Sequence, residues 1–226
     1  SITAFGQLWW GVDLFFAISG FVIARSLIPA LQSCGSRQEY WQQTRDFWLR
    51  RAFRLLPSAW LWLALMLLAC LFLNRSGVFG TTHANVQATL AGLAQYANFR
   101  LADSFFHYEY GTSFVYWSLS LEEQFYLLFP LLILVCRKHL VWVLLVLVLV
   151  QLFTVRTATL MFVRTDALAL GVLLAMWSAQ PSFLRWEPTF LRRPWAGASA
   201  LMALSLTLGF MATERFTLAH YRIGVI

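Results

Sequence analysis

Long apolar stretches alternate along the chain with shorter polar and basic segments. Six of them reach or approach the length of about 20 mainly apolar residues that a helix needs to cross a bilayer. They cover residues 8–24, 55–73, 115–136, 140–155, 158–179 and 195–212. No internal repeat and no low-complexity linker interrupts them. The pattern predicts an all-α, polytopic transmembrane helical bundle of about six spans, forming a single domain over residues 1–226.

A mixed region, residues 74–114, separates the second apolar stretch from the third. Its inner part, residues 86–99, is short and only weakly apolar. We interpret it as an interfacial or re-entrant helix, because it is too short and polar to cross a bilayer comfortably. The alternative is a further span at this point, which would reverse the orientation of everything after Asn74.

Composition narrows the class of protein. Of the 226 residues, 60% are apolar and 12% are charged, whereas soluble domains have about 45–50% apolar and about 25% charged residues. This excludes a disordered chain and most classes of soluble enzyme. Aromatic residues make up 17% of the chain, as is typical of a helical bundle with aromatic belts at the membrane interfaces.

The net charge of +7 comes almost entirely from arginine, since Lys138 is the one lysine. The basic residues lie mostly between apolar stretches, which favours contact with lipid headgroups and gives no support to nucleic acid as a partner. The denser basic group lies on the side of the bundle that holds residues 25–54. The positive-inside rule therefore predicts that this side is cytoplasmic.

Several kinds of site have no support in the sequence. Cys34, Cys70 and Cys136 are scattered singly, so neither a disulfide framework nor a metal site is expected. No HExxH, CxxC, GxSxG or glycine-rich phosphate loop occurs, which removes the main support for soluble hydrolases, kinases and metalloproteases. No basic segment precedes the first apolar stretch, so no signal peptide is expected.

Charged side chains inside apolar stretches are the candidates for function, because an intramembrane charge costs several kcal/mol unless it is paired or hydrated. Such residues are Asp13, Glu122, Glu123, Arg164 and Asp166. On the six-span interpretation each lies near the outer end of its span, so Asp13 and Glu122 can share one cavity. The alternative is that each charge pairs with an arginine in the headgroup zone.

Adjacent Glu122 and Glu123 point about 100° apart on a helix. We therefore expect one to be the chemical group and the other to pair with an arginine or a headgroup. Ser118 lies one turn before Glu122, and Ser120 lies three residues before Glu123. A hydroxyl and a carboxylate on one helical face can bind a sugar hydroxyl or orient a catalytic base.

Arg50, Arg51 and Arg54 directly precede the second stretch, with Arg50 and Arg54 on one helical face. They can act simply as positive-inside anchors. They can also clamp phosphate, because guanidinium groups match phosphate oxygens in a bidentate manner. A donor such as coenzyme A would fit this cytoplasmic position.

Four segments, in order and spacing, resemble the acyltransferase 3 family of integral-membrane acyltransferases. They are GVDLFFAISGFVI (11–23), FWLRRAFRLLP (47–57), YWSLSLEEQFY (116–126) and RTDALALG (164–171). The corresponding family patterns are GVDLFFxxSGFxI, FxxRRxxRxxP, WSLSxEEQFY and RxDAxxxG. Asn98 falls where the family often has asparagine. The resemblance extends from Gly11 to about Ala175.

The resemblance implies transfer of an acyl group, often acetyl from acetyl-coenzyme A, onto a hydroxyl of a cell-surface glycan or another sugar-containing acceptor. It also implies a fold of about ten helices in a bacterial inner membrane. The family's first helix carries an arginine and, eleven residues later, a histidine thought to be catalytic. Neither precedes Gly11 here, and Val115 stands where the family frequently has another histidine.

The chain thus resembles a fragment that lacks the first helix and the last few, inactive by itself. A histidine outside it would be the base, with Glu122 or Glu123 orienting that base or the acceptor. Arg164 or Ser118 would stabilise the oxyanion. Two other functions stay open: a transporter or exporter of a small acid or glycan, and a non-catalytic membrane assembly subunit.

Overall fold

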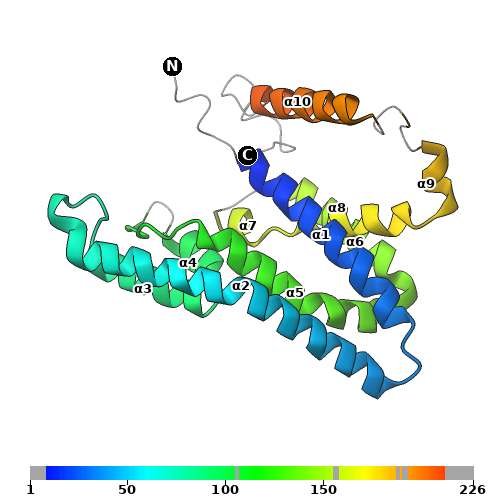
Figure 1. Ribbon diagram of the computed structural model, residues 1–226, viewed down its shortest axis with the longest axis horizontal. Helices are drawn as coiled ribbons and strands as arrows, with labels where there is room; N and C mark the ends of the chain where they lie inside the picture. Colours follow the sequence, from blue (N-terminus) through cyan, green and yellow to red (C-terminus); the bar gives the residue numbers. More distant parts are fainter. Residues whose placement is uncertain (1–8, 105–106, 155–157, 187–188, 190–192, 212–226) are drawn as a thin grey trace. The chain divides into compact units, whose positions relative to one another are not determined.

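The computed structural model describes residues 9–104, 107–154, 158–186, 189 and 193–211, and this part of the chain forms helices and no strand (Figure 1). This confirms the all-α prediction. The longer helices are α1 (Trp9–Gln32), α2 (Arg37–Leu73), α3 (Thr82–Leu93), α5 (Tyr116–Cys136), α6 (Leu140–Phe153), α8 (Asp166–Ser178) and α10 (Pro194–Met211). The shorter ones are η2 (Asn74–Ser76), α4 (Ala97–Ser104), η3 (Arg137–His139), α7 (Ala158–Val163) and α9 (Pro181–Trp186).

Three helical segments of the described part are long and apolar enough to cross a membrane: Gly11–Gln32, Arg37–Ser76 and Tyr116–Phe153. The last of these contains α5 and α6, which correspond closely to the third and fourth predicted stretches. They are separated by η3, where Arg137 has a positive φ of 36°. The chain is therefore an integral membrane protein, and the number of crossings stays a prediction.

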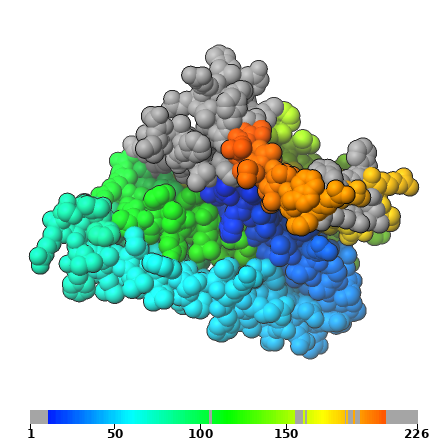
Figure 2. All heavy atoms as spheres, turned by 45° about the horizontal axis from the view of Figure 1, so that its top comes forward, coloured from blue at the N-terminus to red at the C-terminus, as the bar shows by residue number. Residues whose placement is uncertain are grey.

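α2 is longer than a bilayer is thick. Its 37 residues extend about 55 Å at 1.5 Å per residue, against about 30 Å of hydrocarbon. Ser36 begins the helix, and its Oγ accepts a hydrogen bond from the N–H of Glu39 at 3.1 Å, which is the usual N-cap interaction. The first half carries the arginines. The second half, in the cyan part of Figure 2, leaves many apolar side chains exposed, among them Trp60, Leu61, Trp62, Leu65, Leu68, Leu71 and Phe72.

The region between α2 and α5 contains two short helices, α3 and α4, and no helix of spanning length among its described residues. Residues 86–99 are divided between α3, which ends at Leu93, and α4, which begins at Ala97, and their interfacial or re-entrant position stays a prediction. Asn85 holds the surrounding loops together. Its side chain donates to the carbonyls of Phe79 (2.6 Å) and Thr81 (2.9 Å) and accepts from the backbone and hydroxyl of Thr112 (3.0 and 2.8 Å).

The fifth apolar stretch was expected as one segment over residues 158–179, and this expectation is wrong. The structure divides it into α7, which ends at Val163, and α8, which begins at Asp166. The break coincides with the two charged residues of the stretch. Asp166 begins the new helix, and its carboxylate accepts a hydrogen bond from the N–H of Ala167 at 3.0 Å. A carboxylate in the first turn satisfies free N–H groups and suits the helix dipole.

The chain divides into two compact units. Unit 1 comprises residues 1–26, 141–155 and 166–226, and unit 2 comprises residues 27–140 and 156–165. The single domain expected over residues 1–226 stays a prediction. Within unit 1, α1 and α8 approach closely at two glycines. A Cβ on Gly20 would lie 2.2 Å from the carbonyl oxygen of Leu168, and one on Gly171 would lie 2.0 Å from that of Ala17.

Unit 2 is built around α5, which contacts α2, α3, α4 and α7. The ring of Trp117 meets that of Phe162 edge to face, with centroids 5.2 Å apart. Farther along α5, Phe125 and Phe129 stack with centroids 5.0 Å apart. The YWSLSLEEQFY segment therefore forms the first half of the central helix of this unit, and its polar side chains enter a packed interior.

Candidate functional site

Glu122 is held in place by its own helix. The residue is 3% exposed, and its carboxylate accepts a hydrogen bond from the hydroxyl of Tyr126. The two residues are one turn apart and therefore share a face of α5. Tyr126 is 2% exposed, so this hydrogen bond lies inside the unit and fixes the orientation of the Glu122 side chain.

Glu123 points in a different direction and lies in a different environment. Its Oε1 is buried and has no hydrogen-bond partner among the described residues. The charges that act on it are those of Glu122 and Arg51. A buried polar atom without a partner costs roughly 1–3 kcal/mol. This unpartnered oxygen distinguishes Glu123 from Glu122, whose carboxylate accepts from Tyr126.

Arg51 extends from α2 toward α5. The carbon at the centre of its guanidinium lies 5.2 Å from the centroid of the Tyr126 ring and 5.9 Å from that of Phe47. Both distances fall within the range of a cation–π interaction. Glu122 and the Arg51 guanidinium thus both contact Tyr126, one at its hydroxyl and the other at its ring.

The three arginines of the predicted phosphate clamp do not face the same way. Arg51 is half-buried against α5, whereas Arg50 and Arg54 are exposed on α2. The spacing had indicated that Arg50 and Arg54 share a face. In the same helix Arg45 pairs with Asp46 at 3.5 Å, whereas neither Arg50 nor Arg54 has an ion pair within 4.0 Å among the described residues.

Three side chains of α2 and α5 link the two helices through backbone carbonyls. Trp48 donates its indole N–H to the carbonyl of Tyr126 at 3.1 Å, and Tyr40 donates its hydroxyl to that of Pro130 at 2.6 Å. In the other direction Tyr116 donates to the carbonyl of Ala59 at 2.8 Å. These links fix the position of α2, and with it Arg51, relative to the two glutamates.

Asn98 lies completely buried in α4 and forms a two-way amide pair with Gln124 of α5. Each side chain donates to the carbonyl oxygen of the other, at 3.1 and 2.9 Å. Gln124 also donates to the backbone carbonyl of Gln95 at 2.8 Å. Beside this pair the hydroxyl of Ser120 accepts from the N–H of Ala97 at 3.3 Å. The role of Asn98 here is to join α4 to the glutamate-bearing helix.

Ser118 makes a local contact. Its hydroxyl donates to the carbonyl of Val115 at 3.1 Å, a hydrogen bond within one turn of its own helix. The structure therefore separates the two serines, since Ser120 lies buried against α4 and Ser118 lies near the start of α5. Oxyanion stabilisation by Ser118 stays a prediction.

Asp13, Arg164 and Asp166 are the remaining charged residues predicted for the site. Asp13 is half-buried in α1 of unit 1, and Asp166 is half-buried at the start of α8 in the same unit. Arg164 is 9% exposed in unit 2. Each of the three takes part in a polar or electrostatic interaction. A cavity shared by Asp13 and Glu122 stays a prediction, because these residues belong to different units.

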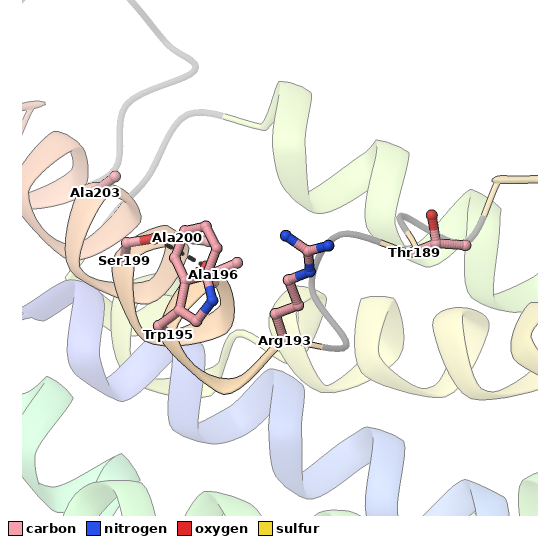
Figure 3. Close-up of a pocket in the computed structure, with 7 residues that line it drawn as sticks. All are labelled: Thr189, Arg193, Trp195, Ala196, Ser199, Ala200 and Ala203. Carbon is pink, nitrogen blue, oxygen red and sulfur yellow. Dashed lines mark hydrogen bonds between the residues drawn. The ribbon is translucent and has the colours of Figure 1, made fainter.

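A hollow of about 750 Å³ lies beside the start of α10. Figure 3 shows Arg193 and Trp195 at its edge, with Ser199 and three alanines on the α10 side. The residues lining it are Thr189, Arg193, Trp195, Ala196, Ser199, Ala200 and Ala203. None of the predicted site residues is among them.

Sequence reasoning did not identify Tyr126, Gln124 or Trp48 as parts of the site. Tyr126 had an available signal, because it lies four residues after Glu122 and therefore on the same helical face. Gln124 and Trp48 had none, since their partners are 26 and 78 residues away along the chain. Only the packing of α2 and α4 on α5 brings them together.

The chain is similar in sequence to known acyltransferases. The family model described as an acyltransferase domain matches residues 8–226. The chain is 30% identical over 138 residues to the peptidoglycan O-acetyltransferase OatA of Listeria monocytogenes, an alignment covering 57% of this chain and 20% of that protein. It is 31% identical over 128 residues to YrhL of Bacillus subtilis, to which the same activity is ascribed without being established, covering 55% and 19%.

A third relative, a candidate O-acetyltransferase of Staphylococcus aureus strain COL, is 31% identical over 127 residues, covering 54% of this chain and 20% of that protein. The alignments thus span about a fifth of the length of these relatives. No solved structure matches the chain.

Proposed function

The chain belongs to the acyltransferase 3 family, whose model it matches over residues 8–226, and from this premise we propose that the full protein is a membrane O-acetyltransferase. It transfers an acetyl group from acetyl-coenzyme A to a hydroxyl of a cell-surface glycan, with peptidoglycan as the first acceptor to test. It does so in a bacterial inner membrane. The relatives named above support both the acetyl group and the acceptor class.

The observation that carries the proposal is the difference in hydrogen bonding between the two glutamates. Glu122 is already engaged by Tyr126, whereas the buried Oε1 of Glu123 has no partner among the described residues. We therefore assign the reactive role to Glu123 and a positioning role to Glu122. A carboxylate with a free oxygen can orient the acceptor hydroxyl, or the base that removes its proton.

The reaction that these groups serve is an ester exchange. The acceptor oxygen forms a bond to the acetyl carbonyl carbon, and the bond from that carbon to the thioester sulfur breaks. The proton of the acceptor hydroxyl leaves through the base and ends on the coenzyme A thiol. Negative charge develops on the carbonyl oxygen meanwhile, and Arg164 is the candidate of this chain to stabilise it.

The donor is expected on the cytoplasmic side, at α2. Arg50 and Arg54 are exposed and one turn apart, and a guanidinium there can take a phosphate of coenzyme A in a bidentate manner. Arg51 instead lies over Tyr126, so it links the helix proposed to bind the donor with the helix that carries the glutamates. In this proposal phosphate recognition lies on α2 and the reactive carboxylate lies on α5, which packs against α2.

The test is acetyl transfer by the full-length protein in lipid nanodiscs. The protein is incubated with acetyl-coenzyme A labelled in the acetyl group and with soluble glycan strands released from peptidoglycan. Label that becomes bound to glycan and is released by mild alkali identifies an O-acetyl ester. Glycan that stays unlabelled while the donor is intact and the protein folded would contradict the proposal, and movement of label across proteoliposomes without ester formation would favour an exporter.

A further inference from the structure

A second cluster of polar and aromatic side chains lies around the end of α4. Its centre is Arg100, which is 9% exposed. Its Nη1 donates to the carbonyl of Tyr110 at 2.9 Å, and its Nη2 donates to the carbonyl of Ala84 at 3.4 Å and to Oε1 of Gln87 at 3.2 Å. One buried arginine therefore fastens the loop that contains Tyr110 to α3.

Two tyrosine rings lie against the guanidinium of Arg100. Its central carbon is 4.4 Å from the ring centroid of Tyr110 and 5.9 Å from that of Tyr108. Tyr110 is buried, whereas Tyr108 is 47% exposed. The hydroxyl of Tyr108 donates to Oδ2 of Asp103 at 2.6 Å. The Tyr108 side chain is thus exposed, with its hydroxyl bonded to Asp103 and its ring beside the Arg100 guanidinium.

An exposed aromatic ring that is held in one orientation is unusual for a loop. Most exposed side chains keep their rotamer freedom and would lose it on binding, at a cost of about 0.5–1.5 kcal/mol each. Tyr108 has lost that freedom before any molecule binds. Asp103 and His107 are exposed beside it, and the Nδ1 of His107 lies 3.1 Å from the carbonyl of Asp103. The other imidazole nitrogen of this exposed residue is not used in that contact.

The chemistry of this surface matches a pyranose. A sugar ring presents one face of C–H groups, which packs on an aromatic face, and a rim of hydroxyls, which bond to carboxylate and imidazole groups. Phosphate is a poorer match, because Arg100 is already occupied by three acceptors. The orientation predicted from the basic residues places this region at the outer face of the membrane, where a cell-surface glycan lies.

We propose that Tyr108, with Asp103 and His107, forms a sugar-binding platform that docks the glycan acceptor. This inference rests on the proposed function for the identity of the glycan as acceptor. The platform binds a pyranose unit of the strand by stacking on Tyr108, and Arg100 holds the platform without touching the sugar. It acts in acceptor binding and takes no part in bond making or breaking.

Direct binding tests the platform independently of acetyl transfer. Soluble glycan strands released from peptidoglycan are titrated onto the full-length protein in nanodiscs, without donor, by isothermal titration calorimetry. Tyr108→Ala should weaken binding about tenfold, the equivalent of about 1.4 kcal/mol. Tyr108→Phe keeps the ring and loses the hydrogen bond to Asp103, so it should weaken binding much less. Phe99→Ala, which removes another exposed aromatic side chain of α4, is the matched control and should bind as wild type.

Steady-state kinetics then separate this inference from the proposed function. With transfer observed, Tyr108→Ala should raise KM for glycan and leave kcat and the KM for acetyl-coenzyme A unchanged. If glycan binds and depends on Tyr108 while no acetyl is transferred, the platform stands and the proposed function fails. If Tyr108→Ala and Phe99→Ala bind glycan equally, or if Tyr108→Phe is as weak as Tyr108→Ala, no stacking platform exists.

Discussion

Trp48 donates its indole N–H to the carbonyl oxygen of Tyr126 at 3.1 Å, and this carbonyl is the one that Pro130 leaves unsatisfied. In a regular helix the N–H of residue 130 would donate to the carbonyl of residue 126, but proline has no N–H. A side chain of α2 therefore replaces a hydrogen bond that α5 cannot make for itself. The same helix turn carries the hydroxyl that binds Glu122.

Replacing Trp48 with phenylalanine should destabilise the protein because it leaves that carbonyl without a donor. The expected cost is about 1–3 kcal/mol, the usual penalty for an unsatisfied buried polar group. Thermal unfolding in nanodiscs measures it. Trp41→Phe is the control, since Trp41 is an exposed tryptophan of the same helix. In a Pro130→Ala background the alanine N–H can take over, so the effect of Trp48→Phe should shrink there, and an equal effect in both backgrounds would refute the replacement.

Gly20 and Gly171 should each tolerate no side chain. A Cβ at either position would lie within 2.2 Å of a backbone carbonyl oxygen of the other helix, so α1 and α8 would have to separate. Such overpacking typically costs about 1–3 kcal/mol or more. Gly20→Ala and Gly171→Ala should therefore lower the unfolding temperature clearly. Gly11→Ala in the same helix as Gly20 is the control, because its Cβ would meet nothing within 4 Å, and equal effects of all three would show that the close approach is absent.

The helix boundaries in the apolar stretches could be predicted well where the length of the apolar stretch determines them. The third and fourth stretches, residues 115–136 and 140–155, match α5 and α6 because the basic residues 137–139 form a clear boundary. The second stretch was less well predicted. The basic residues before it continue the same helix back to Arg37, since Ser36 provides the cap and a lone proline, Pro57, does not end the helix. Charge changes the environment of a helix along its length without ending it.

The break in the fifth stretch and the contact of Arg51 with Tyr126 could not be predicted from a single sequence. The fifth stretch breaks between Val163 and Asp166, and the chain passes there from one compact unit to the other, a division that apolar length alone does not indicate. The spacing of Arg50 and Arg54 did predict their common face. It could not indicate that Arg51 would lie over Tyr126, because that contact depends on how α2 packs against a helix 65 or more residues later in the chain.

The raised pKa of Tyr108 should make the stability of the folded protein depend on pH. The hydrogen bond to Asp103 is the main cause that raises this pKa above its usual value, with burial and the Asp103 charge adding to it and Arg100 opposing it. A raised pKa means that folding favours the neutral phenol, so its contribution is present below about pH 10, the unfolded value, and is lost as pH rises through the folded pKa. Unfolding temperatures of wild type and Tyr108→Phe should therefore converge above pH 10, and a difference that stays constant to pH 11 would contradict this.

Lysine replacements should separate the three arginines of α2. Lysine also obeys the positive-inside rule but binds phosphate as a point charge. Arg50→Lys and Arg54→Lys should therefore raise KM for acetyl-coenzyme A with little change in the unfolding temperature. Arg51→Lys should lower that temperature instead, by weakening the contacts to Tyr126 and Phe47, each worth about 0.5–2 kcal/mol. Full activity of the Arg50→Lys/Arg54→Lys double variant at limiting donor would exclude a bidentate phosphate clamp.

Glu123→Gln should abolish most acetyl transfer while Glu122→Gln is milder. Glutamine preserves the shape of both side chains and removes the charge, so it separates chemistry from packing. At position 122 the amide oxygen can still accept the hydroxyl of Tyr126, which keeps the site assembled. At position 123 the carboxylate oxygen without a described partner is the group assigned to the reaction, and loss of a catalytic acid or base typically costs about 10²–10⁴-fold in rate.

Both variants are compared with wild type for amount of folded protein, unfolding temperature and initial rate of glycan acetylation. Tyr126→Phe, which removes the hydroxyl that donates to Glu122 but keeps the ring under Arg51, should resemble Glu122→Gln. If Glu123→Gln acetylates at the wild-type rate, or if Glu122→Gln is the more damaging of the two in well-folded protein, the assignment of the reactive carboxylate is wrong.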